Sequence, residues 1–146
     1  MPEIKRMRQE HLSAVAAIEA EVFSLPWSKQ GFADTLTMEN VIFLVAEADD
    51  IVVGYCGIYL AADEGEITNV AVSPMYRRQG IADALLKSLL EETKKRGTTR
   101  LILEVRASNE PAIRLYEKFG FKIQGVRKNF YDKPKEDAYV MILEDQ

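Results

Sequence analysis

A short basic turn at residues 75–82, MYRRQGIA, has residue types that favour the binding of an anion. It follows a β-branched run and opens a run with helical spacing, and the first amides of a helix carry roughly half a positive charge without internal partners. Gly80 lets backbone approach a phosphate without a Cβ in the way, while Arg77 and Arg78 add positive charge. The turn is neither a Walker loop, because no Gly-Lys-Ser/Thr follows, nor a dinucleotide fingerprint, which needs three spaced glycines. The alternative interpretation is a loop followed by a solvated, basic helix start.

Glu104 is a carboxylate in the middle of an apolar strand pattern, RLILEVR. Alternation places Leu101, Leu103 and Val105 on one face of this strand, and Glu104 and Arg106 on the other. A carboxylate in mid-strand is costly unless it has partners or a task. Glu104 could therefore take a proton from a reacting group. The alternative is a partly exposed glutamate that pairs with Arg106 or a nearby lysine.

Three other reactive side chains have structural interpretations. Tyr116 shares a helical face with Ile113, which is typical of a core residue. Cys56, within IVVGYCGIYL, is expected to be a small buried hydrophobe, and no histidine is placed to activate it as a nucleophile. His11, the sole histidine, is expected on the surface or in a capping role. A single cysteine also excludes an intramolecular disulfide and a cysteine-rich zinc site, and we expect no metal.

The composition indicates an ordinary globular protein. With 146 residues, the chain is most simply one domain, residues 1–146, and is long enough to bury a core. Hydrophobic content of 47% with 29% charged residues argues against disorder, and a net charge of −4 gives no support for nucleic-acid binding. The N-terminal region has no apolar signal segment, and no run approaches a membrane span. We therefore expect a cytoplasmic protein without membrane contact.

The hydrophobic pattern alternates between helical and strand periods and predicts a mixed α/β domain. Expected strands are 4–7, 41–48, 51–61, 66–72, 100–106, 121–126 and 138–143. Expected helices are 11–23, 29–38, 79–96 and 110–118. Ser28 and Asn109 are predicted N-caps, Gly97 and Gly120 are predicted helix ends, and the aspartates at 49–50 predict a hairpin turn.

Over nearly its whole length, the chain resembles the GCN5-related N-acetyltransferase (GNAT) family. The motifs that carry the likeness are PWS at 26–28, ITNVAVSPMYRRQGIADALL, LEVRASNEPAIRLYEKFGF, and GVRKNFY followed by EDAYVM. More narrowly, the chain is similar to the RimI-like branch, which acetylates the N-terminal alanine of a ribosomal protein. Ala82 departs from the glycine of many relatives, and Phe130 from the tyrosine of close ones. The resemblance implies a GNAT fold, with a central mixed, mostly antiparallel sheet flanked by about four helices.

The resemblance also implies where acetyl-CoA would bind. The backbone of Val70, Ala71 and Val72 is expected to pair with the pantetheine arm, as an added strand would. The expected pyrophosphate-binding residues are Arg78, Gln79, Gly80, Ile81, Ala82 and Asp83. Asn109 matches a cofactor-contacting asparagine of the family, and it can cap the following helix as well.

For the chemistry, the resemblance implies that Glu104 deprotonates the acceptor amine, directly or through water, and that Tyr116 protonates the departing sulfur. An oxyanion donor is expected among the backbone amides of 66–72. Deprotonating an α-amine at pH 7 costs roughly 1.4 kcal/mol, against roughly 4.6 kcal/mol for a lysine, which favours a protein N-terminus as acceptor. Trp27 and Tyr131 are expected to wall the peptide slot, or else to pack as aromatics at a surface junction.

Two other functions fit the same residues. The chain could acetylate a lysine, a polyamine or another small amine, or it could bind acetyl-CoA without catalysis. An acceptor panel separates the first from N-terminal acetylation, and insensitivity to Glu104→Gln would favour the second. The expected partners remain acetyl-CoA and a protein N-terminus, with no nucleic acid.

Overall fold

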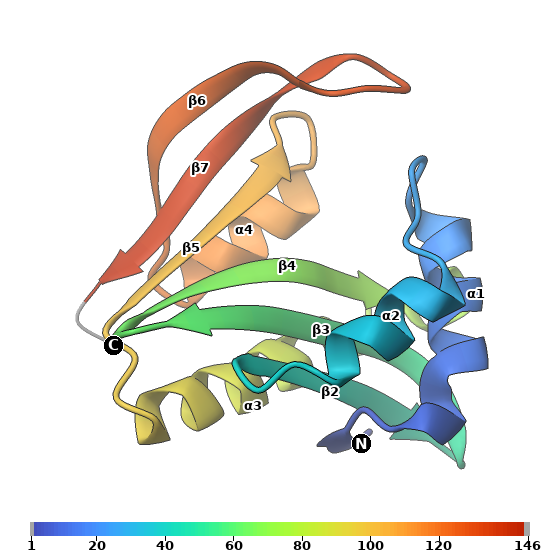
Figure 1. The fold of residues 1–146 in the computed structure, drawn as a ribbon. Helices are drawn as coiled ribbons and strands as arrows, with labels where there is room; N and C mark the ends of the chain where they lie inside the picture. Colours follow the sequence, from blue (N-terminus) through green and yellow to red (C-terminus); the bar gives the residue numbers. More distant parts are fainter. Residues whose placement is uncertain (1, 145–146) are drawn as a thin grey trace.

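The computed structural model describes residues 2–144 and contains seven strands and four α-helices (Figure 1). The strands are β1 (Glu3–Arg6), β2 (Val41–Ala48), β3 (Ile51–Ala61), β4 (Glu64–Val72), β5 (Arg100–Arg106), β6 (Lys122–Tyr131) and β7 (Glu136–Glu144). The helices are α1 (Leu12–Val22), α2 (Lys29–Leu36), α3 (Ile81–Lys95) and α4 (Glu110–Lys118), with short 3₁₀ turns at Gln9–His11 and Pro74–Tyr76. The predicted mixed α/β architecture is confirmed.

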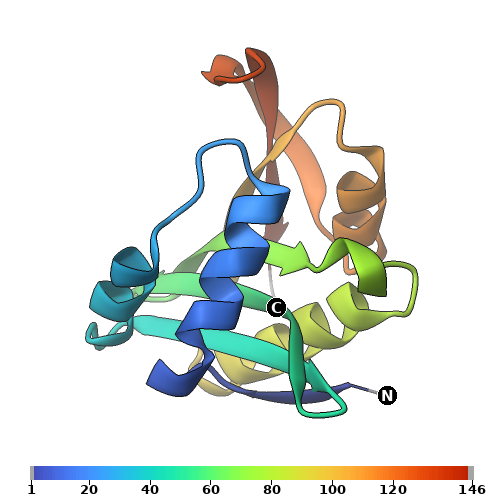
Figure 2. The same ribbon diagram turned by 90° about the vertical axis from the view of Figure 1, so that its right-hand side faces the viewer.

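All seven strands form one sheet in the order β1-β2-β3-β4-β5-β7-β6. Neighbouring strands are antiparallel except β4 and β5, which are parallel and are joined through α3. Helices α1 and α2 cover one face of the sheet, and α3 and α4 cover the other (Figure 1, Figure 2). Each face buries its own apolar cluster, so the sheet separates two layers of core.

The local signals in the sequence explain most element boundaries. Asp49 and Asp50 both have positive φ angles, 53° and 64°, which suits the tight turn between β2 and β3. The Ser28 side chain accepts a hydrogen bond from the Gly31 amide at the start of α2. At the start of α4, Asn109 accepts one from the Ala112 amide in the same way.

Several boundaries differ from the prediction. Helix α3 begins at Ile81, because the preceding glycine adopts a left-handed conformation that cannot continue a helix. A 3₁₀ turn precedes α1, which starts at Leu12. Strand β4 begins earlier than predicted, at Glu64, and β7 begins earlier, at Glu136. Strand β6 extends to Tyr131, and its pairing with β7 resumes there after an irregularity that no apolar pattern in the sequence indicates.

His11 is buried, so a surface position is wrong, whereas the predicted capping role is confirmed. Its side chain is 7% exposed, and its Nδ1 accepts a hydrogen bond from the Arg8 amide at 2.9 Å. Its Nε2 lies 3.6 Å from a carboxylate oxygen of Glu47 on β2. The imidazole therefore caps the 3₁₀ turn that precedes α1. This position is far from the strands that build the site described below.

The parallel pair β4 and β5 opens along its length. Residues 64–66 pair with residues 100–102, and the two strands then diverge (Figure 1). On its other edge, β4 stays paired with β3 up to Val72, with a bulge at Thr68. The carboxyl-terminal half of β4 therefore turns an unpaired backbone edge towards a wedge-shaped opening in the middle of the sheet.

A buried carboxylate ties α1 to that half of the sheet. Glu19 is 2% exposed and accepts hydrogen bonds from the Asn69 amide at 3.2 Å, from the Tyr55 hydroxyl and from the Trp27 backbone N–H at 3.0 Å. Burial and this hydrogen bond raise the pKa of Tyr55, which keeps the phenol protonated as a donor. Glu19 thus joins α1, the loop after it, β3 and β4.

Within residues 2–144, no helix is both long enough and apolar enough to cross a lipid bilayer.

Removing the Glu19 carboxylate should cost more stability than removing one of its donors. Glu19→Ala leaves three buried donors without an acceptor, so we expect the free energy of unfolding to fall by about 3 kcal/mol or more. Tyr55→Phe removes a single donor and should cost about 1 kcal/mol. Urea denaturation followed by circular dichroism measures both. Equal losses for the two variants would show that the carboxylate does not organise this region.

Candidate active site

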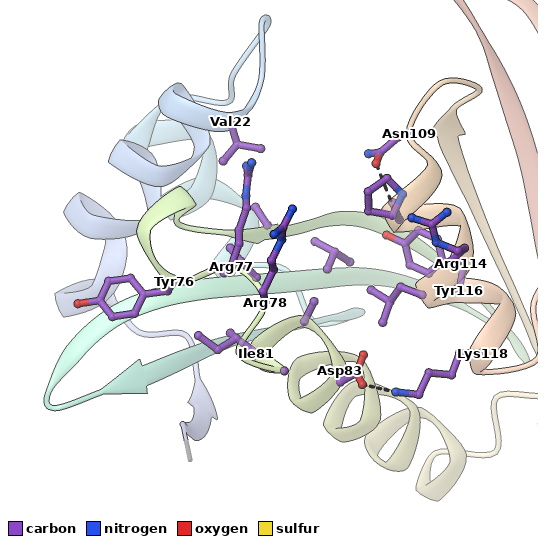
Figure 3. Close-up of a pocket in the computed structure, with 18 of the residues that line it drawn as sticks. Val22, Tyr76, Arg77, Arg78, Ile81, Asp83, Asn109, Arg114, Tyr116 and Lys118 are labelled. Atoms are coloured by element: carbon purple, nitrogen blue, oxygen red, sulfur yellow. Dashed lines mark hydrogen bonds and ion pairs between the residues drawn. The ribbon is translucent and has the colours of Figure 1, made fainter.

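A cavity of about 790 Å³ lies between the start of α3 and helix α4, over the open half of β4 (Figure 3). The β4 residues Val70, Ala71 and Val72 line it, as do Tyr116 of α4 and Val22 at the end of α1. The cavity is therefore continuous with the wedge between β4 and β5. It offers a long, partly apolar channel with an exposed backbone edge on one side.

The turn before α3 has a conformation suited to an anion. Arg78 has φ 65° and Gly80 has φ 77°, so two residues of the turn are left-handed. Such a sequence of conformations turns successive amides towards one concave side. A Cβ added at Gly80 would meet nothing within 4 Å, so the requirement for glycine comes from its φ angle rather than from crowding. The first residues of α3, Ile81, Ala82 and Asp83, line the cavity together with this turn.

Positive side chains converge on the cavity from two elements. Arg77 and Arg78 come from the turn, and Arg114 and Lys118 come from α4 on the opposite wall (Figure 3). Lys118 pairs with Asp83 in the first turn of α3, which links the two walls. The α4 cations were missed in the sequence analysis. Their spacing of four residues indicates one helical face, but which face points to the cavity depends on how α4 packs.

Tyr116 is brought into the wall of the cavity and is also part of the core. It is 7% exposed and its ring packs edge-on against Phe121 at 5.7 Å. Burial, with smaller contributions from Cys56 and Tyr131, raises the pKa of Tyr116. The phenol is therefore protonated across the neutral range. The core interpretation of this tyrosine is confirmed, and it is compatible with a hydroxyl directed at the cavity.

Cys56 is fully buried, as expected. Burial raises the pKa of its thiol, so the thiolate required of a nucleophile is disfavoured.

Glu104 lies on the other side of the wedge from the cavity. Its neighbours Leu101, Leu103 and Val105 are buried among α3 and α4, so its own side chain projects from the α1 and α2 face of β5. The side chain is 15% exposed and forms an ion pair with Arg127, not with Arg106 or a nearby lysine as the alternative interpretation expected. Burial and the neighbouring Glu66 raise the pKa of Glu104, and Arg127 opposes them. A carboxylate whose pKa is raised in this way is a stronger base than an ordinary glutamate.

Tyr131, at the end of β6, interacts electrostatically with both Glu104 and Tyr116. Burial and the charge of Glu104 raise the pKa of Tyr131, and Tyr131 in turn contributes to the raised pKa of Tyr116. The guanidinium of Arg106 sits over the Tyr131 ring at 4.5 Å and donates to carbonyl oxygens of the β6–β7 turn. Tyr131 is thus held in place beside both the carboxylate and the phenol.

Trp27 packs as a junction residue. Its ring lies 5.1 Å from Phe32 and 6.2 Å from Phe43, and Glu19 binds its backbone amide. Its loop touches the β6–β7 turn through Ser24, whose hydroxyl lies 3.5 Å from the carbonyl oxygen of Asp132. The packing alternative is confirmed for Trp27, and its role in a peptide slot stays a prediction.

The structure brings most of the predicted cofactor-binding residues into one cavity. Those that line it are Val70, Ala71, Val72, Arg78, Gly80, Ile81, Ala82, Asp83 and Asn109. Gln79 is exposed and does not line the cavity. Glu104, Trp27 and Tyr131 are partly buried and also lie outside it. Among the described residues, no cluster of histidine, cysteine, aspartate and glutamate could hold a metal ion.

Comparisons with known proteins indicate one and the same family. The sequence pattern of the Acetyltransferase (GNAT) family matches residues 12–121. A Bacillus subtilis (strain 168) protein, provisionally named an alanine N-acetyltransferase of ribosomal protein bS18, is 44% identical over 140 residues, which cover 94% of this chain and 92% of that protein. The Escherichia coli (strain K12) ribosomal protein bS18-alanine N-acetyltransferase is 37% identical over 145 residues, which cover 98% and 97%.

Solved structures agree with the sequence relatives. The crystal structure of the Escherichia coli ribosomal-protein alanine N-acetyltransferase has a TM-score of 0.92 at 36% identity, covering 100% of this chain and 95% of that chain. The PaiA N-acetyltransferase of Thermoplasma acidophilum, solved in complex with coenzyme A, shares the fold with a TM-score of 0.79 at 21% identity and 99% coverage of both chains. The chain therefore belongs to the GNAT family of N-acetyltransferases, which use acetyl-CoA as the acetyl donor.

Proposed function

We propose that this protein transfers the acetyl group of acetyl-CoA to the α-amine of a protein N-terminus, and that its substrate is the N-terminal alanine of a small-subunit ribosomal protein in the cytoplasm. The Escherichia coli relative is named as an alanine N-acetyltransferase of ribosomal protein bS18, and the Bacillus subtilis relative carries that name provisionally; both match this chain over almost its full length. The observation that carries the proposal is the wedge between β4 and β5. It has a cation-lined cavity on one side and a partly buried carboxylate on the other.

The cavity has the features that acetyl-CoA requires. The left-handed turn at Arg78 and Gly80, with the amides of Ile81, Ala82 and Asp83, would hold the pyrophosphate. The unpaired edge at Val70, Ala71 and Val72 would pair with the amides of the pantetheine arm. Asn109 would contact the same arm while it caps α4. Gln79 is exposed, so we limit its contribution to its backbone.

Acetyl-CoA, when bound, supplies the thioester whose carbonyl carbon the acceptor nitrogen attacks. In our proposal Glu104 takes the proton that the amine loses, directly or through water, because its raised pKa makes it a better base than an ordinary carboxylate. The new C–N bond replaces the C–S bond. A backbone amide of β4 near its bulge would stabilise the negative charge on the carbonyl oxygen.

The departing sulfur needs a proton, and Tyr116 is the proposed donor. Its raised pKa keeps the hydroxyl protonated at the pH at which the amine is attacked. Burial makes the phenol a weaker acid, but it also disfavours a thiolate beside it, and this second effect offsets the first and favours proton transfer to the sulfur as the C–S bond breaks. Glu104 and Tyr116 therefore stand on opposite sides of the wedge, one for each proton transfer.

The acceptor would enter from the α1 and α2 side, between the loop that carries Trp27 and the turn that follows Tyr131. These two segments touch through Ser24, whose hydroxyl lies 3.5 Å from the carbonyl oxygen of Asp132. The lower cost of deprotonating an α-amine favours an N-terminus over an internal lysine as the acceptor.

An acceptor panel tests the proposed function. With labelled acetyl-CoA, a peptide that starts with alanine should be acetylated with a higher kcat/KM than the same peptide with a blocked N-terminus and a free lysine, because the α-amine loses its proton more easily. A polyamine serves as the small-amine control. Faster acetylation of the polyamine or of the blocked peptide would contradict N-terminal acetylation, and binding of acetyl-CoA without turnover of any acceptor would contradict an enzyme.

Replacing Glu104 tests the base. Glu104→Gln keeps the shape of the side chain but cannot take a proton, so kcat should fall by about 100-fold or more, with little change in the dissociation constant for acetyl-CoA. In the parent, kcat/KM should fall as the pH drops through the raised pKa of Glu104, above the ordinary glutamate range. This loss at low pH should disappear in the variant. An unchanged profile in the variant would assign the titration to another group.

Replacing Tyr116 tests the acid. Tyr116→Phe removes the hydroxyl and leaves the packing against Phe121, so we expect a fall in kcat of about 100-fold with an unchanged fold. An acyl donor with a more acidic leaving thiol needs less help from a proton donor. It should therefore recover part of the lost rate. Equal losses with both donors would indicate that the hydroxyl positions the thioester rather than protonates the sulfur.

A further inference from the structure

Arg127 forms an ion pair with Glu104 from two strands away. Its Nε lies 3.2 Å from one carboxylate oxygen, Oε2. Arg127 is on β6 and pairs in register with Ala138 on β7, which pairs with Arg106 on β5. The Arg127 side chain therefore crosses β7 to reach Glu104. The β7 residue paired with Arg127 is Ala138, which is small and fully buried.

The guanidinium of Arg127 also packs against an aromatic ring. Its guanidinium lies 5.6 Å from the centroid of the Phe130 ring, on the same strand. The Arg127 side chain is 55% exposed, whereas that of Glu104 is 15% exposed. An arginine packed on a ring can leave solvent at low entropic cost when a ligand covers it, because its planar head is already oriented.

Among the charged groups around Glu104, Arg127 differs from the others in its contacts. On β4, Glu66 is a like charge close enough to raise the pKa of Glu104, and Tyr131 lies beside it on β6. Arg106 projects from the same face of β5 but is engaged with Glu136 and with the carbonyl oxygens of the β6–β7 turn. Within residues 2–144, Arg127 is the cation in ion-pair contact with Glu104.

We infer that Arg127 is a positioning residue for acetyl transfer: it holds Oε2 of Glu104, keeps the carboxylate ionised between Glu66 and the core, and leaves Oε1 for the acceptor amine. This inference rests on the proposed role of Glu104 as the base. Without the arginine, the charge of Glu66 would act on Glu104 unopposed and favour its protonated form, and a protonated Glu104 cannot take a proton from the acceptor. The ion pair sets the pH above which the base is available.

An ordinary surface ion pair would have no such effect, since exposed pairs contribute little. The Arg127 pair differs because one partner is largely buried and faces a like charge. The effect of this pair on the pKa of Glu104 also has a definite direction. Removing Arg127 should raise the pKa of Glu104, so activity should be lost at a higher pH than in the parent, whereas removing Glu66 should have the opposite effect.

The test compares Arg127→Gln with Arg127→Lys, which keeps the charge, and with Lys128→Gln, which removes the same charge from the adjacent exposed residue. The Glu104 carboxyl carbon is titrated by 13C NMR in protein labelled at glutamate, and its resonance is assigned by its loss in Glu104→Gln. Arg127→Gln should raise the titration midpoint by about half a pH unit to one unit, given the partial exposure of the pair. Arg127→Lys should recover most of the shift, Lys128→Gln should show none, and Glu66→Gln should lower the midpoint.

The kinetic arm measures kcat/KM for an alanine-initiated peptide from acidic to neutral pH. The acid limb of Arg127→Gln should move upward by the same amount as the carboxyl midpoint. A midpoint that does not move, or moves equally in Lys128→Gln, would overturn the inference, and so would a moved midpoint with an unmoved acid limb in an enzyme that depends on Glu104. If Glu104→Gln retained full turnover, the proposed base would be wrong, and the carboxyl titration would still decide whether Arg127 controls Glu104.

Discussion

The short parallel contact between β4 and β5 is the constraint on which the rest of the site depends. Residues 64–66 pair with 100–102, and beyond them the two strands separate. A sheet interior normally satisfies every backbone group, so an open edge in its middle must be completed by water, another chain or a ligand. The edge at Val70, Ala71 and Val72 is such a place, and the cavity above it leads to the amides that open α3. The divergence of β4 and β5 thus creates both the channel and the unpaired backbone groups that line it.

The same opening divides the candidate site between the two faces of the sheet. The turn before α3 lies on one face, together with α3, α4 and Tyr116. Glu104 projects from the other face. In the proposed reaction, acetyl-CoA and the acceptor approach from opposite sides and meet in the wedge, and Glu104 and Tyr116 each have one proposed proton transfer. Glu19 maintains this arrangement, because its buried carboxylate holds α1 and the loop after it against β3 and β4.

Electrostatics around the site is balanced rather than dominated by a single sign. The chain has a net charge of −4, yet the cavity is bordered by Arg77, Arg78 and Arg114. These cations suit a phosphate-rich ligand that the acidic chain as a whole would repel. On the acceptor side, Glu66 and Arg127 act on Glu104 in opposite senses. For the electrostatics of the site, the position of each charge in the fold therefore matters more than the net charge of the chain.

Much of this protein was determined by local sequence. The β-branched runs, the caps Ser28 and Asn109 and the glycine at position 80 specify elements through interactions within a few residues, so a pattern along the chain is enough to predict them. The family motifs add the cavity-lining turn. Tertiary structure alone decided which side chains meet. Arg127 pairs with Glu104, which is 23 positions away in sequence across β7, and Glu19 collects donors from three other segments. Such contacts depend on strand order and register, which arise from packing of the whole sheet and leave no periodic trace in the sequence.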